Sequence, residues 1–185
     1  MKVLYTKLKN HLIDTTAVAT AMNPLMAGVE VGAAGMTNET SMHARLLGSV
    51  LLYAGLGSVY SQGRDLSKKL FGITKETSEV VKTIHDSAYT FAFTVALQPP
   101  FYYVVGSRNV KEIIIGTIGA GAISSLFGPV TGYMVDTYRD FTGIKGTERL
   151  PSFLKNHDPT TKKYMAGLLT AASVGLLAGI YAMNR

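Results

Sequence analysis

The sequence contains no cysteine and no tryptophan, and only 16% of its 185 residues are Asp, Glu, Lys or Arg. The absence of cysteine excludes disulfides, thiolate metal sites and cysteine nucleophiles. There are only 4 histidines, without HExxH or paired spacing, so we expect neither a metal ion nor another cofactor. The charged fraction is well below the roughly 25% of a typical soluble domain, whereas 47% of the residues are hydrophobic. This composition is typical of a membrane protein.

Charged residues are absent from four long intervals, of 18, 21, 23 and 21 residues, at 46–63, 87–107, 113–135 and 164–184. A helix needs about 20 residues to cross the hydrocarbon core of a bilayer. A fifth interval, 12–34, is apolar apart from Asp14 and Glu30, and it is too long and too polar for a cleaved signal. The sequence therefore predicts five transmembrane helices, approximately at 12–34, 45–63, 86–107, 112–135 and 164–183. A soluble all-α bundle with unusually buried helices is the alternative.

The Lys and Arg residues alternate between the segments that connect these spans. From the N-terminus to the C-terminal tail, the segments hold 3, 1, 5, 2, 6 and 1 of them. Because basic residues accumulate on the cytoplasmic side, this series predicts a cytoplasmic N-terminus and an extracytoplasmic C-terminus in a prokaryotic inner membrane. The net charge of +6 would then face anionic lipid headgroups, and no nucleic-acid partner is needed to explain it.

Several features recur along the chain at one spacing. Asn23-Pro24 and Gln98-Pro99 lie 75 residues apart, and so do Arg64-Asp65 and Arg139-Asp140. Asp14 and Asp86 lie 72 residues apart. We predict an all-α membrane fold with two parallel helical-hairpin repeats and a C-terminal helix. Its segments are a cytoplasmic N-terminus (1–11), a first hairpin (12–66), a basic loop (67–85), a second hairpin (86–141), a cytoplasmic loop (142–163) and a fifth span (164–185).

The repeated amide-proline pairs are the candidate substrate site. A proline removes a backbone donor from a helix, and the carbonyl that loses it needs another partner in lipid. Interrupted helices at matching positions of two repeats are typical of transporter binding sites. The candidate substrate-binding residues are Asn23, Gln98, Pro99 and Pro100. The alternative is that these prolines only shape helix packing.

Ionisable residues within or beside the predicted spans are candidates for proton coupling or gating. Charges at membrane depth are costly and usually functional. Glu30 is the deepest, and Asp136 and Arg139 have the spacing of an ion pair on one helix face. The candidate coupling or gating residues are Asp14, Glu30, Arg64, Asp65, Asp86, Asp136, Arg139 and Asp140. For Asp86, Asp136 and the two Arg-Asp pairs, interfacial anchoring or loop closure is the alternative.

Small residues spaced four apart are typical of close helix contact, within one chain or in a homo-oligomer. They occur at Gly28 and Gly32, at Gly128 and Gly132, and at Ala171, Gly175 and Gly179. No catalytic set is evident, because the histidines lie outside the spans or at their borders. We therefore do not expect an enzyme.

Short motifs in the first hairpin resemble the bacterial L-alanine exporter family. They are Asp14-Thr15-x-Ala17, Glu30, Gly35-Met36, Glu39, Ser41, Arg45-Leu46 and Arg64-Asp65. The second hairpin is similar to that family at Asp86, Gln98, Pro100, Tyr102, Gly132-Tyr133-x-x-Asp136 and Arg139. The resemblance covers about 12–141.

The resemblance implies a small inner-membrane protein of four spans that exports alanine or a similar small amino acid, coupled to the proton gradient. Two features depart from the family pattern, namely the extension over 142–185 and Asn23-Pro24. The leading interpretation is a secondary transporter with Glu30 or Asp14 as proton carrier. A non-transporting scaffold or assembly subunit that uses its glycine faces is the alternative. A channel is a third, although no span carries a continuous polar stripe.

Overall fold

A computed structural model describes residues 2–74, 76–147 and 150–184, and the described residues form helices, turns and loops without a strand. The chain divides into two compact units. Unit 1 comprises residues 2–24, 129–147 and 150–183, and unit 2 comprises residues 25–74, 76–128 and 184. The all-helical class predicted from the sequence is confirmed.

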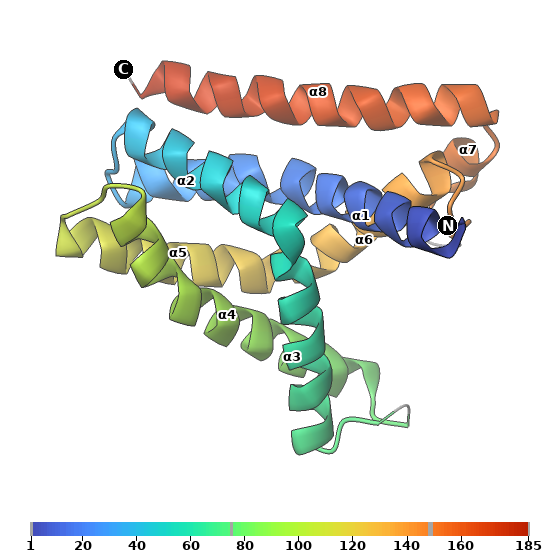
Figure 1. The fold of residues 1–185 in the computed structure, drawn as a ribbon, viewed down its shortest axis with the longest axis horizontal. Helices are drawn as coiled ribbons and strands as arrows, with labels where there is room; N and C mark the ends of the chain where they lie inside the picture. The colour runs from blue at the N-terminus through green and yellow to red at the C-terminus, as the bar shows by residue number, and fades with distance from the viewer. Residues whose placement is uncertain (1, 75, 148–149, 185) are drawn as a thin grey trace. The chain divides into compact units, whose positions relative to one another are not determined.

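Unit 1 is built from the first part of α1 (Lys2–Ala27), α6 (Gly128–Phe141), the short α7 (Ser152–Lys155) and α8 (Pro159–Met183). Its core contains Ala17, Tyr138, Phe141, Leu150 and Ala166. The Tyr138 hydroxyl lies 3.2 Å from Thr20 Oγ1 and 2.7 Å from Thr170 Oγ1, so one buried tyrosine joins α1, α6 and α8. Figure 1 shows α8 as the red helix.

Unit 2 contains the end of α1, the π-helix η1 (Gly28–Ala33), α2 (Asn38–Leu51), the π-helix η2 (Leu52–Leu56), α3 (Gly57–Leu70), α4 (Glu79–Val104) and α5 (Val110–Leu126). Its core contains Ala34, Met36, Ala44 and Tyr102. The helices α4 and α5 pack along each other as a hairpin (Figure 1).

Glycines on α5 allow this close approach. A Cβ atom on Gly116 would lie 2.7 Å from Met36 Cε, and one on Gly121 would lie 3.0 Å from the Phe91 ring. By contrast, the glycines predicted to make flat faces on α8, Gly175 and Gly179, have no atom within 4 Å of an added Cβ. The glycines of α5 therefore serve packing within unit 2, whereas among the described residues of unit 1 nothing lies against Gly175 or Gly179.

Helix starts follow local capping chemistry. Thr37 and Ser78 each accept a bond from the backbone N–H three residues on, and Asn109 accepts from the N–H of Lys111. Asp158 accepts from the N–H groups of Thr160 and Thr161 and precedes Pro159, a residue suited to the first helical turn. These caps place the helix starts after the polar loops.

Two of the predicted spans are interrupted in the structure. The interval 45–63 runs through α2, η2 and α3, with Gly55 at φ 116° inside the break, and α3 turns away from α2 there (Figure 1). The interval 112–135 divides between α5 and α6 at Phe127. A glycine tolerates positive φ at no steric cost, which explains the break at Gly55. Apolarity is continuous across both breaks, so hydropathy did not reveal them.

Among the helices of the described residues, α8 alone is both long enough and apolar enough to cross a membrane by length and composition. It covers the predicted fifth span. The other four spans and the two-repeat organisation stay predictions.

Candidate functional site

Glu30, predicted to be the deepest charge, lies in η1 and is fully buried in unit 2. Its Oε2 accepts hydrogen bonds from Ser41 Oγ at 2.7 Å and from Arg45 Nε at 3.1 Å. Its Oε1 accepts from the Tyr102 hydroxyl at 2.9 Å and from Arg45 Nη2. A two-pronged guanidinium and two hydroxyls thus surround one carboxylate, and every contact is a donor. This is the arrangement that matches a carboxylate group.

The partners of Glu30 come from different elements. Ser41 and Arg45 are four residues apart on α2, so they share one face of that helix. Tyr102 comes from the last turn of α4 and is fully buried. The cluster therefore ties η1, α2 and α4 together. Sequence reasoning missed these partnerships, although all three residues are among those that carry the family resemblance.

A second cluster in unit 2 is centred on Asp86 of α4. Arg64 of α3 places Nη2 at 3.0 Å from Asp86 Oδ2, and Lys68 places Nζ at 3.0 Å from Oδ1. His85 Nδ1 lies 3.2 Å from the same Oδ1. Asp86 and Arg64 are each about one-third exposed, so the ion pair is reached by water.

Unit 1 contains a matching ion pair. Arg139 of α6 donates from Nε to Asp14 Oδ1 of α1 at 2.6 Å, and its Nη2 donates to Asp14 Oδ2. The hydrogen bond with Asp14, followed by the attraction of Asp14 and of Asp136, raises the pKa of Arg139. Arg139 thus forms an ion pair with a carboxylate on another helix, and it is also attracted by Asp136, which lies one turn earlier on its own helix.

The two ion pairs correspond under the predicted repeat. Arg64 and Arg139 close the first and second predicted hairpins, and Asp14 and Asp86 open them. Arg64 of the first hairpin pairs with Asp86 of the second, and Arg139 of the second pairs with Asp14 of the first. Each ion pair therefore joins one predicted hairpin to the other.

The remaining candidate residues have separate places. Asp140 accepts from Lys162 Nζ at 2.6 Å and from the Thr147 backbone N–H at 3.2 Å. The side chain of Asp65 lies outside the described part of the chain. In α1, Asn23 is half-buried and Pro24 is buried, whereas in α4 Gln98 and Pro99 are half-buried and Pro100 is exposed. Asn23 belongs to unit 1 and Gln98 to unit 2.

The family model described as "AlaE: L-alanine exporter" matches residues 3–145. The chain belongs to the L-alanine exporter family. No curated protein and no solved structure matches it. The matched range contains every candidate site residue, and it confirms the family resemblance predicted over 12–141. L-alanine exporters are membrane transporters rather than enzymes, which places this chain in amino-acid transport.

Helix α8 lies outside the range matched by the L-alanine exporter family, yet it is bonded to residues inside it. Pro24 has no N–H to offer the Thr20 carbonyl four residues earlier. That carbonyl instead accepts a hydrogen bond of 2.7 Å from Ser173 Oγ of α8. The two features that depart from the family pattern, Pro24 and the C-terminal helix, therefore meet at one hydrogen bond.

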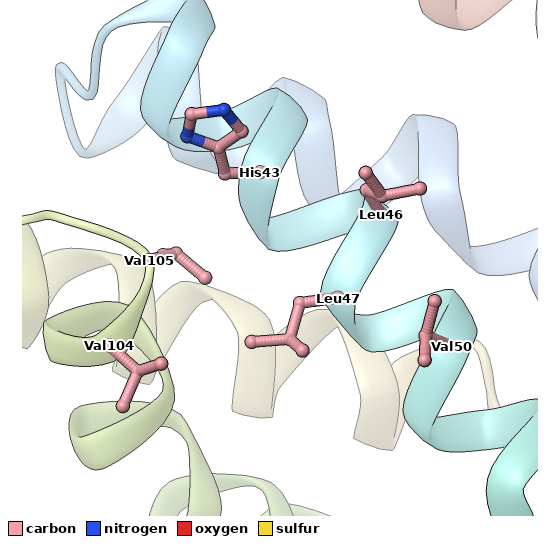
Figure 2. A pocket seen from close by; sticks show the side chains of 6 residues that line it. All are labelled: His43, Leu46, Leu47, Val50, Val104 and Val105. Atoms are coloured by element: carbon pink, nitrogen blue, oxygen red, sulfur yellow. The ribbon is translucent and has the colours of Figure 1, made fainter.

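An open apolar groove of about 350 Å³ lies in unit 2 between α2 and the end of α4 (Figure 2). Its lining residues are His43, Leu46, Leu47, Val50, Val104 and Val105. This lining contains no carboxylate, guanidinium or ammonium, so it offers little to a zwitterionic amino acid. Among the described residues, no group of three or more His, Asp or Glu side chains could hold a metal ion.

Proposed function

We propose that this protein exports L-alanine or another small amino acid across a prokaryotic inner membrane, driven by the proton gradient. Membership of the L-alanine exporter family carries this proposal. The exposed apolar side chains support the membrane setting. On α8, Leu168, Val174 and Leu176 are all more than half exposed, as expected for a surface that faces lipid.

The reciprocal ion pairs are the proposed gate. Each joins the end of one predicted hairpin to the start of the other, at the side where the basic residues predict the cytoplasm. Breaking both pairs would let the hairpins separate at that side, and re-forming them would close it. Paired rearrangement of two repeats is the usual basis of alternating access.

The proposed proton carriers are Asp14 and Asp86 rather than Glu30. Asp14 and Asp86 are each about one-third exposed or slightly less, so protons can reach them from water. Glu30 is fully buried, and its carboxylate oxygens already accept hydrogen bonds from Ser41 and Tyr102, so they are not open to a proton from water. We therefore assign Glu30 a role in holding η1, α2 and α4 together during the transport cycle.

Alanine efflux from preloaded proteoliposomes tests the proposal. The purified protein is expected to release L-alanine faster than protein-free vesicles, and an inward proton gradient is expected to accelerate the release. Large amino acids such as phenylalanine serve as the matched control and should stay inside. Vesicles that retain every small amino acid tested, with or without the gradient, would favour the scaffold alternative, which needs the glycines but not the buried polar residues.

A further inference from the structure

The buried face of α5 contains one polar group that the fold does not satisfy. The buried residues of this helix are Gly116, Thr117, Ala120, Gly121 and Ser124, and their spacing places them on one face. Thr117 is 5% exposed, and its Oγ1 is enclosed without a hydrogen-bond partner in the described part of the chain. An unpaired buried hydroxyl is destabilising, and more so at membrane depth.

Other helical threonines of this chain do not leave a buried hydroxyl unpaired. Thr90, Thr137 and Thr170 each donate to the carbonyl four residues earlier, at 2.7, 2.8 and 3.1 Å. The same bond would satisfy Thr117 through the carbonyl of Ile113, but the structure does not make it. The hydroxyl of Thr117 is thus left available on a face lined with small residues.

The α4 residues beside this face include the two prolines. Gly116 lies against Tyr102, and Gly121 lies against Phe91 and Val95, so Thr117 is level with the stretch of α4 between Val95 and Tyr102, which contains Pro99 and Pro100. Pro99 and Pro100 have no N–H to give the carbonyls of Val95 and Ala96. Val95 faces α5 whereas Ala96 is exposed, so the α4–α5 hairpin brings together one hydroxyl donor, on Thr117, and one residue whose carbonyl lacks its helical donor, Val95.

We propose that the Thr117 hydroxyl is a substrate contact that donates to the carboxylate of a small amino acid, whose ammonium group meets the carbonyl of Val95. The proposal rests on the amino-acid export proposed above. The small residues Gly116, Ala120 and Gly121 surround the hydroxyl on the same face, so a small separation of the helices would admit a small substrate more readily than a large one. Binding requires α4 and α5 to separate slightly at this level.

The prolines of the two helices then have different roles. In α1, the carbonyl freed by Pro24 is bonded by Ser173. In α4, the prolines lie in the stretch that is level with an unpaired hydroxyl. The substrate site is accordingly assigned to the second predicted repeat, with Thr117 added to Gln98, Pro99 and Pro100.

Thr117→Val tests this assignment, because it removes the hydroxyl and keeps the shape. In detergent, L-alanine is expected to raise the melting temperature of the wild-type protein. Thr117→Val should need an L-alanine concentration at least about tenfold higher to reach the same shift in melting temperature, as expected for a lost hydrogen bond to a charged group. Thr117→Ser should behave like the wild type. L-alaninamide, which lacks the carboxylate, should bind the wild type and Thr117→Val alike.

The melting temperature without alanine separates a binding role from a structural one. Thr117→Val should melt at or above the wild-type temperature, because no hydrogen bond is lost. Thr137→Val is the matched control, since Thr137 is 4% exposed and its hydroxyl is bonded to the Tyr133 carbonyl. It should melt lower and keep its alanine response.

Equal alanine responses in the wild type and Thr117→Val would overturn the Thr117 assignment and leave the export function standing. A wild-type protein that neither responds to L-alanine nor transports it would overturn both proposals. A lower melting temperature of Thr117→Val without alanine, at unchanged alanine affinity, would show a structural hydroxyl and contradict the assignment.

Discussion

At the scale of single residues, the buried contacts of Glu30 favour a structural role over the proton-carrying role that its sequence position suggests. The sequence places it inside an apolar interval, which favours a proton carrier. The structure surrounds it with Ser41, Arg45 and Tyr102, all as donors. Such a group stabilises contacts between segments, and removing one partner leaves the other charge buried and uncompensated.

Arg45→Met should therefore lower the free energy of unfolding by about 3–5 kcal/mol, because the Glu30 carboxylate loses its cation. Thermal unfolding in detergent measures this loss. Arg108→Met is the control, since that side chain is exposed, and it should melt close to the wild type. Glu30→Gln combined with Arg45→Met should recover part of the loss. Equal melting of Arg45→Met and Arg108→Met would refute the structural role of the pair.

At the scale of helices, the two proline-containing helices are alike in sequence and differ in contacts, and the predicted interruption at their prolines was wrong. Both α1 and α4 are continuous helices of 26 residues with proline near the C-terminal end. Proline explains why each helix loses a backbone bond, but the partner that replaces it depends on tertiary contacts. For α1, that partner is Ser173, supplied by the helix beyond the family match.

Ser173→Ala should cost about 1 kcal/mol of stability, the typical contribution of one hydrogen bond. In a Pro24→Ala background the same change should cost much less, because residue 24 then supplies its own N–H to the Thr20 carbonyl. A double-mutant cycle of unfolding free energies in detergent measures the difference. Identical costs in the two backgrounds would show that Ser173 does not compensate for the proline.

The helices also show which features of the fold could be predicted from the sequence. Long uncharged intervals correctly predicted a helical protein, and the short motifs correctly predicted the family. The breaks at Gly55 and Phe127 were missed, because apolar residues continue through both. The partners of Arg64 and Arg139 were missed as well, because ion pairs between distant segments depend on the folded arrangement. The unpaired hydroxyl of Thr117 has no sequence signal at all.

At the scale of the whole molecule, the proposed topology places residue 7 in the cytoplasm and residue 184 outside. The chain contains no native cysteine, so a single introduced cysteine reports its own position. In intact cells, an impermeant thiol reagent should label Asn184→Cys and leave Lys7→Cys unlabelled until the membrane is opened. Labelling of both positions from one side would require an even number of spans.

The reciprocal ion pairs are the proposed gate of the exporter, and charge reversal tests this role directly. Alanine efflux from proteoliposomes is measured for Asp14→Arg, for Arg139→Asp and for the double variant. Each single variant should lose most of the efflux, by about tenfold or more, because two like charges then face each other. The double variant should recover a large part of it, since the pair is restored in reverse. Single variants that export alanine at the wild-type rate would contradict the account.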